Sequence, residues 1–170
     1  MWLMWWTLAR PAEATEAEWT EFDLDNALWT IPAARMKARR EQVIPLPFQA
    51  VKMLRTLQGL TGHRQHLFPG RDNPLGPMTS HSLRQLLKSL GWSGIYSPHA
   101  TRTTGSTRLN EMGYRPDVIE AQLTHADTNN VRRTYNHATY LDKRKVMMQE
   151  WADKLDEWVD IDKNFDIDKQ

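Results

Sequence analysis

The stretch that decides the fold is SPHATRTTGSTRLNEMG, residues 97–113. Ser97 followed by Pro98 is typical of a helix start, with the serine as N-cap and the proline as first helical residue. His99 and Arg102 are three residues apart, so a helix over 98–112 places both side chains on one face. Free N–H groups at a helix start favour an anion. Taken alone, however, the stretch favours an ordinary capped surface helix.

The pattern on either side predicts a mainly α-helical domain with a small antiparallel three-stranded β-sheet (α+β). Apolar periodicity, caps and breaks predict helices at 2–9, 12–18, 47–58, 79–90, 98–112, 116–123, 128–135 and 139–159. Strand character predicts a meander of 19–24, 28–32 and 42–46. Residues 59–77 hold four of the eight glycines and are expected to form a long loop. The acidic segment 160–170 is expected to be a disordered tail.

Composition excludes some classes of protein and favours others. The chain has 170 residues, which suits one domain, and it has no cysteine, which excludes disulfides and thiolate metal sites. Its apolar start, MWLMWWTLAR, is too short to span a bilayer and lacks the features of a signal peptide. Residues 31–149 carry eighteen basic and seven acidic side chains, whereas both ends are acidic. This asymmetry fits either a surface that binds a polyanion or helices with solvated basic faces.

Two basic sites stand before the opening stretch. Arg10 follows the apolar start in LARPAE, and an arginine there needs either an external anion or a carboxylate. On its own an ion pair with Glu13, three residues on, is the simpler interpretation. The segment ARMKARR lies between two predicted strands, where it fits either a phosphate clamp or a solvated turn. Its spacing does not choose among its four cations, which are Arg35, Lys37, Arg39 and Arg40.

Two further candidate residues follow the stretch 97–113. His125 lies in QLTHAD at the end of an apolar helix pattern, where a capping or partly buried histidine is the usual case. Tyr135 lies in VRRTYN, at helical spacing from Val131, where core packing is usual. The other histidines form no pair with the spacing of a zinc site, so no metal is expected. They are His63, His66, His81 and His137.

The order of these elements resembles that of the tyrosine recombinases, also called phage integrases. RPAE resembles the first arginine motif of the family, and a lysine on a β-hairpin follows it. SPHATRTTGSTRLNEMGYRPDVIEAQLTHADTNNVRRTYNHATYL resembles the remaining boxes through to the nucleophile. Runs similar to PDVIEAQL, VRRTYN and MMQEWAD occur in integrases of satellite phages and genomic islands. The resemblance covers about residues 3–158.

The resemblance implies site-specific DNA recombination, or integration, through a 3′-phosphotyrosyl intermediate and without a cofactor. It implies that Arg10 and Arg102 hold the non-bridging phosphate oxygens and that Lys37 protonates the leaving 5′ oxygen. His99 would act as general base, His125 would donate a hydrogen bond to the phosphate, and Tyr135 would be the nucleophile. Further DNA contacts are expected from basic residues around the lysine and the tyrosine, namely Arg35, Arg39, Arg40, Arg132 and Arg133.

The resemblance also implies partners and a location. We expect double-stranded DNA at attachment sites, self-association on DNA as in the tetramers of the full-length family, and a place in the bacterial cytoplasm at the nucleoid. Residues 1–159 are expected to be an N-terminally truncated catalytic domain, because no core-binding or arm-binding domain precedes the first arginine motif. The spacing from His125 to Tyr135 is one residue longer than usual, which leaves Tyr140 as an alternative nucleophile.

Other functions remain open at this point. A type IB topoisomerase-like nicking and closing enzyme would use the same chemistry without strand exchange. A truncated remnant that only binds DNA would need no nucleophile, and neither would a plain helical DNA-binding module.

Overall fold

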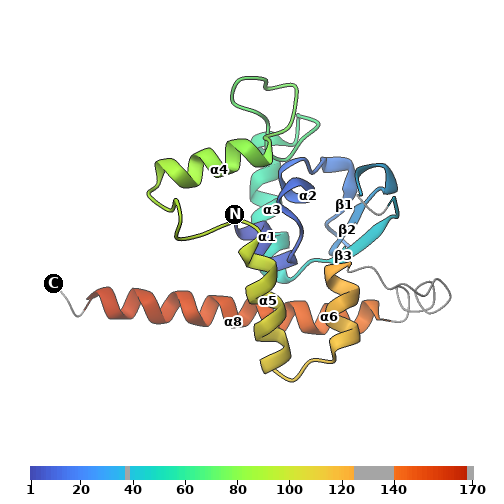
Figure 1. Cartoon of the computed structure of the whole chain (residues 1–170). Coiled ribbons are helices and arrows are strands. Elements are labelled where there is room, and N and C mark those ends of the chain that lie inside the picture. The colour runs from blue at the N-terminus through green and yellow to red at the C-terminus, as the bar shows by residue number, and fades with distance from the viewer. Residues whose placement is uncertain (37–38, 125–139, 168–170) are drawn as a thin grey trace.

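The computed structural model describes residues 1–36, 39–124 and 140–167, with side chains described to residue 160. Figure 1 shows the small sheet and several helices in the upper part of the domain and one long helix, α8 (Leu141–Ile167), across its lower part. The helices are α1 (Trp2–Thr7), α2 (Pro11–Thr15), α3 (Phe48–Thr61), α4 (Ser80–Ser89), α5 (Ala100–Glu111), α6 (Pro116–Leu123) and α8 (Leu141–Ile167). The strands are β1 (Phe22–Asp23), β2 (Leu28–Ile31) and β3 (Gln42–Pro45), with 3₁₀ turns η1 (Trp19–Glu21) and η2 (Ala33–Arg35).

The sheet confirms the predicted antiparallel meander. Its order is β1–β2–β3, and Trp29 on the central strand is opposite Phe22 on one side and Ile44 on the other. The first strand is shorter than the predicted 19–24, because its first half forms η1. There the Trp19 indole donates to the carbonyl of Thr61 at 3.0 Å, which ties this part of the chain to the end of α3.

The core joins the first described helix to the last. The apolar side chains of α1 are buried against the apolar stripe of α8, and the Trp151 indole donates to the carbonyl of Trp5 at 2.7 Å. Helix α1 also contacts α3 and α5, and α6 packs on both α5 and α8. Consequently α1 lies between the sheet half of the chain and the helical half, and its end is where the two halves meet.

Several predicted helix boundaries are wrong. Helix α2 ends at Thr15 and not at 18, and α3 continues to Thr61, three residues into the predicted loop. Three further differences lie nearer the site or the tail. Helix α1 ends at Thr7 because Leu8 adopts a left-handed conformation, with φ at 53°. Helix α5 begins at Ala100 with His99 as its N-cap, and not at Pro98 with Ser97 as the cap, because the Ser97 carbonyl accepts the Ala100 N–H in a turn at 2.8 Å. The long helix also continues past 159.

The backbone of 160–167 is helical where a disordered tail was expected. This segment contains no proline or glycine, so each residue extends an existing helix at little cost once α8 has formed. The predicted helix over 128–135 lies outside the described residues.

Gly105 allows α5 and α1 to approach closely. A Cβ atom built at this position would lie 2.4 Å from Cδ2 of Leu8 and 2.8 Å from Cδ1. Leu8 is fully buried, so its side chain would have to move within the core to make room for this atom. The absence of a side chain at 105 thus sets the spacing between these two helices.

We expect Gly105→Ala to destabilise the protein, although alanine is normally the better helix former by about 0.5–1 kcal/mol. Overpacking of a filled core costs about 1–3 kcal/mol, which outweighs that gain. Urea unfolding measures the change, with Thr104→Ala on the exposed face of the same helix as the control. Adding Leu8→Ala should reduce the cost of the alanine. Equal or greater stability of Gly105→Ala would show that the two helices are not in close contact.

Candidate active site

The structure brings together three of the predicted site residues. Arg10, His99 and Arg102 line one hollow of about 450 Å³, although they come from the loop after α1, the N-cap of α5 and the first turn of α5. Hydroxyl-bearing side chains of α5 complete its wall, together with Leu123 at the end of α6. His99 is exposed and Arg102 is buried, so His99 lies where the hollow opens to solvent and Arg102 forms part of its inner wall.

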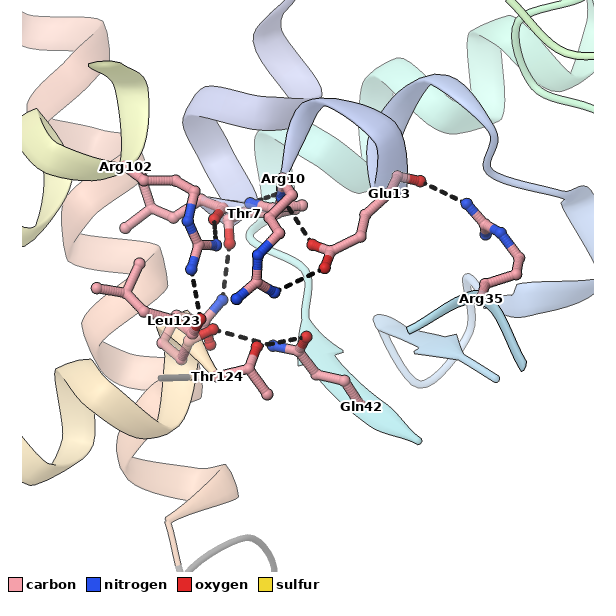
Figure 2. Close-up of polar contacts among 11 residues, drawn as sticks. Thr7, Arg10, Glu13, Arg35, Gln42, Arg102, Leu123 and Thr124 are labelled. Carbon is pink, nitrogen blue, oxygen red and sulfur yellow. Dashed lines mark hydrogen bonds and ion pairs between the residues drawn. The ribbon is translucent and has the colours of Figure 1, made fainter. Parts of the chain in front are cut away.

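Arg102 is held between the C-termini of two helices. Its Nη1 donates to the carbonyl of Leu8 at 2.5 Å, and its Nη2 donates to the carbonyl of Leu123 (Figure 2). Both acceptors lie where a helix ends in a left-handed turn, at Leu8 itself and at Thr124, whose φ is 51°. Carbonyls at helix C-termini lack partners within the helix and carry the negative end of its dipole. They therefore orient this cation and stabilise it.

Burial lowers the pKa of Arg102 to about 10, and the nearby charge of Arg10 adds to the effect. The guanidinium is still protonated at neutral pH, because this pKa remains well above 7. Two neighbouring cations, one of them desolvated, make the hollow electropositive. An anion with several acceptor oxygens suits such a site, because each guanidinium offers a planar set of donors.

Arg10 makes the ion pair that the sequence suggested. Its Nη1 donates to Glu13 Oε1 at 2.8 Å, and its backbone N–H donates to Glu13 Oε2 at 2.7 Å, which caps α2. Glu13 is buried, whereas the Arg10 side chain is 31% exposed. Arg10 also lines the hollow, and Figure 2 shows its guanidinium pointing toward the end of α6. The ion pair therefore orients Arg10, and the two interpretations of this arginine are compatible.

Arg35 makes internal contacts, although the sequence suggested that it faces DNA. Its Nη2 donates to the carbonyl of Glu13 at 2.8 Å, and its Nη1 donates to both carboxylate oxygens of Glu21 (Figure 2 shows the first contact). Glu21 also accepts from the indole of Trp29 at 2.9 Å. Arg35 thus links the Arg10 segment to the sheet. Arg39 and Arg40 are exposed on the same connection between β2 and β3.

Several candidates lie outside the described residues: Lys37, His125, Arg132, Arg133 and Tyr135. Tyr140 can be placed, and its hydroxyl donates to Asp117 Oδ2 at 2.7 Å. Asp117 is in the first turn of α6, whereas Leu123, which contacts Arg102, is in the last. Six residues of helix separate them by about 9 Å. The Tyr140 hydroxyl is therefore held at the opposite end of α6 from the hollow.

Sequence reasoning missed two groups of residues near the site. Arg10 and His99 line a second hollow, of about 320 Å³, that also includes Ser80 and Arg84 of α4. Behind Arg102 lies a hydrogen-bonded set with no motif spacing, formed by the buried side chains of Gln42 and Gln122, the partly buried side chain of Thr124 and the backbone carbonyl of Thr7. For this second group the only signal in the sequence was Gln122, a polar residue inside the apolar pattern of 118–123.

Within the residues that the structure describes, no helix has both the length and the apolar character needed to cross a membrane.

Comparison with known proteins assigns the family. The model of the phage integrase family matches residues 1–141. Prophage integrase IntA of Escherichia coli (strain K12) is 48% identical over 147 residues, which cover 86% of this chain and 36% of that protein. The chain spans 36–41% of the length of the curated relatives it matches.

Solved structures share the fold. The integrase from mycobacterium phage Brujita superimposes with a TM-score of 0.65 at 20% identity, over 88% of this chain and 49% of that one. The Tn1549 transposon integrase, solved in complex with circular intermediate DNA, superimposes with a TM-score of 0.53 at 18% identity, over 79% of this chain and 50% of that one. The predicted mainly helical fold with its three-stranded sheet is confirmed by these neighbours. Given the extent of the family match and the identity to IntA, the chain belongs to the phage integrase family, whose members are tyrosine recombinases.

Proposed function

We propose that this chain is the catalytic domain of a site-specific DNA recombinase that cleaves and rejoins DNA through a 3′-phosphotyrosyl intermediate. The observation that carries the proposal is the position of Arg102, fixed by two helix-end carbonyls at a hollow that it shares with Arg10 and His99. Family membership makes a phosphodiester the expected anion for this site. A fixed pair of guanidinium groups suits a phosphate whose charge increases in the transition state.

The chemistry needs a nucleophile, a base, an acid and charge stabilisation. Tyr135 Oη forms a bond to phosphorus, and the bond from phosphorus to the 5′ oxygen breaks. His99 accepts the tyrosine proton, and Lys37 supplies a proton to the departing oxygen. Arg10 and Arg102 hold the non-bridging oxygens, and His125 donates a further hydrogen bond. Attack by a 5′ hydroxyl reverses the step, so the phosphodiester is restored without a cofactor.

The partner that we propose is double-stranded DNA. The Tn1549 integrase, which shares this fold, is solved with DNA, and the excess of basic side chains over residues 31–149 suits a polyanion. Arg39, Arg40 and Arg84 are exposed cations that we propose contact phosphates, and Arg132 and Arg133 are further candidates. Assembly of several copies on DNA, and work at the bacterial nucleoid, are part of the same proposal.

A trapping experiment tests the proposed function. The chain is incubated with a pool of duplexes of randomised sequence, each nicked so that the cleaved end is lost by diffusion. We expect a covalent protein–DNA product on a denaturing gel, and sequencing of the trapped DNA should recover a preferred site. DNA binding without any covalent product would support a binding-only protein. Relaxation of supercoiled plasmid without joined recombinants would support a topoisomerase-like enzyme.

A further inference from the structure

Thr124 occupies a backbone conformation that suits glycine. Its φ and ψ are 51° and 40°, in the left-handed region, and it ends α6 as the residue after Leu123. A β-branched side chain is strained there, whereas glycine adopts the same conformation at little cost. Ending the helix therefore does not explain a threonine. Such strain persists where the surrounding contacts fix the residue, and these sites are often functional.

The side chain of Thr124 makes a specific contact. Its Oγ1 donates to Oε1 of Gln42 at 2.7 Å, and Nε2 of Gln42 donates to the carbonyl of Gln122 at 3.0 Å. Nε2 of Gln122 in turn donates to the carbonyl of Thr7 at 2.8 Å. Both glutamines are buried, with 2% and 1% of their surface exposed. Figure 2 shows the hydroxyl of Thr124 and the amide of Gln42 facing each other below Arg10.

These contacts hold the peptide unit whose carbonyl accepts from Nη2 of Arg102, and they also hold the peptide unit that precedes the acceptor of Nη1. The Leu123 carbonyl and the Thr124 nitrogen belong to one planar peptide unit, so anchoring Thr124 fixes the direction of the Leu123 oxygen. At the other end, the anchored Thr7 carbonyl directly precedes Leu8 in the chain. The acceptors of Nη1 and Nη2 are the carbonyls of Leu8 and Leu123. The hydrogen bonds therefore act on the Leu123 acceptor through Thr124, and on the peptide unit that precedes the Leu8 acceptor.

We propose that Thr124 is a positioning residue for Arg102, and that its hydroxyl, through Gln42, fixes the Leu123 carbonyl that orients this guanidinium toward the phosphate. The proposal rests on the proposed function. It explains why a strained threonine stands where a glycine would end the helix. It also gives the start of β3 a role in the site, although no side chain of β3 lines the hollow.

Three substitutions separate the hydroxyl from the backbone strain. Thr124→Val keeps the branched shape and removes the hydroxyl, Thr124→Gly removes both the hydroxyl and the strain, and Thr124→Ser keeps the hydroxyl. We expect the valine and glycine variants to cleave the trapped substrate about tenfold to a hundredfold more slowly in a single turnover, with DNA affinity unchanged. The serine variant should restore the rate. Thr56→Val, the same change on the exposed face of α3, should leave the cleavage rate unchanged.

Thr124→Gly is decisive, because the relief of strain offsets at least part of the cost of leaving Gln42 Oε1 without its donor, so this variant should remain folded. A stable glycine variant that cleaves slowly supports positioning. A glycine variant that cleaves at the wild-type rate, or a serine variant as slow as valine, overturns it.

A second measurement does not depend on cleavage. Guanidinium ¹⁵N NMR, with the Arg102 signals assigned by their loss in Arg102→Lys, should show two separate Nη signals in the wild type, because carbonyl contacts slow rotation. The valine and glycine variants should show averaged signals. If the wild type never cleaves DNA, the proposed function fails, yet this measurement still tests the positioning. Separate signals in both variants would overturn the proposal.

Discussion

Tyr135→Phe is expected to abolish the covalent protein–DNA product, and Tyr140→Phe is expected to leave it. Phenylalanine keeps the ring but lacks the oxygen that bonds to phosphorus, so the variant has no nucleophile at this position. Tyr140 is the matched control, because it is the alternative nucleophile and lies only five residues after Tyr135. Its hydroxyl donates to Asp117 at the far end of α6 from Arg102.

The control should also remain folded. Asp117 keeps two other contacts when the Tyr140 hydroxyl is removed, since Nε and Nη2 of Arg115 donate to its two oxygens at 3.0 and 2.6 Å. A denaturing gel of the trapped product, run beside a filter-binding assay on the same DNA, separates loss of chemistry from loss of binding. If Tyr140→Phe lost the product and Tyr135→Phe kept it, the nucleophile would be Tyr140 and our assignment would be wrong.

Arg102→Lys is expected to reduce the rate of cleavage by about 10²–10³-fold, which is the usual cost of removing one preorganised donor from a site of developing charge. Lysine keeps the positive charge, but its ammonium is a compact group that cannot bridge two carbonyls and also offer a planar set of donors to a phosphate. The change also leaves the carbonyl of Leu8 or Leu123 short of a partner inside the protein.

Arg108→Lys is the matched control on the same helix. Arg108 is exposed, pairs with Glu111 at 2.8 Å and lies over the ring of Trp158. We expect this variant to cleave at close to the wild-type rate. Single-turnover rates should be measured under conditions in which each variant is folded, as established by urea unfolding. An Arg102→Lys variant that is folded and cleaves within a few fold of the wild type would contradict the role of this guanidinium.

The sequence predicted most of the helices and the order of the sheet, because apolar periodicity and turn residues report directly on local structure. It also predicted that His99 and Arg102 share a face, since their spacing within one helix sets this. Arg10 was assigned to the same site only because the chain resembles a known family. No local pattern shows that the end of α1 contacts the first turn of α5.

Contacts between distant segments explain the differences. Arg35 stands in a basic run that suits DNA, yet folding brings Glu21 and the carbonyl of Glu13 to its guanidinium. Gln42 and Gln122 are buried with their hydrogen bonds satisfied, and each finds its partner only after β3 and α6 pack together. Residues 160–167 looked like a tail by charge, but they continue a helix that is stabilised elsewhere, by its buried stripe on α1.

The contacts that build the proposed site and the core behind it span long stretches of chain. Arg102 and Leu8 are 94 residues apart, Gln122 and Thr7 are 115 apart, and Trp151 and Trp5 are 146 apart. Closing such loops costs entropy before their contacts contribute, so high contact order slows folding and delays these contacts. We therefore expect the two arginines to meet late on the folding pathway. A partly folded chain would hold separate arginines and no assembled site, so we expect the proposed DNA cleavage only from molecules that have finished folding.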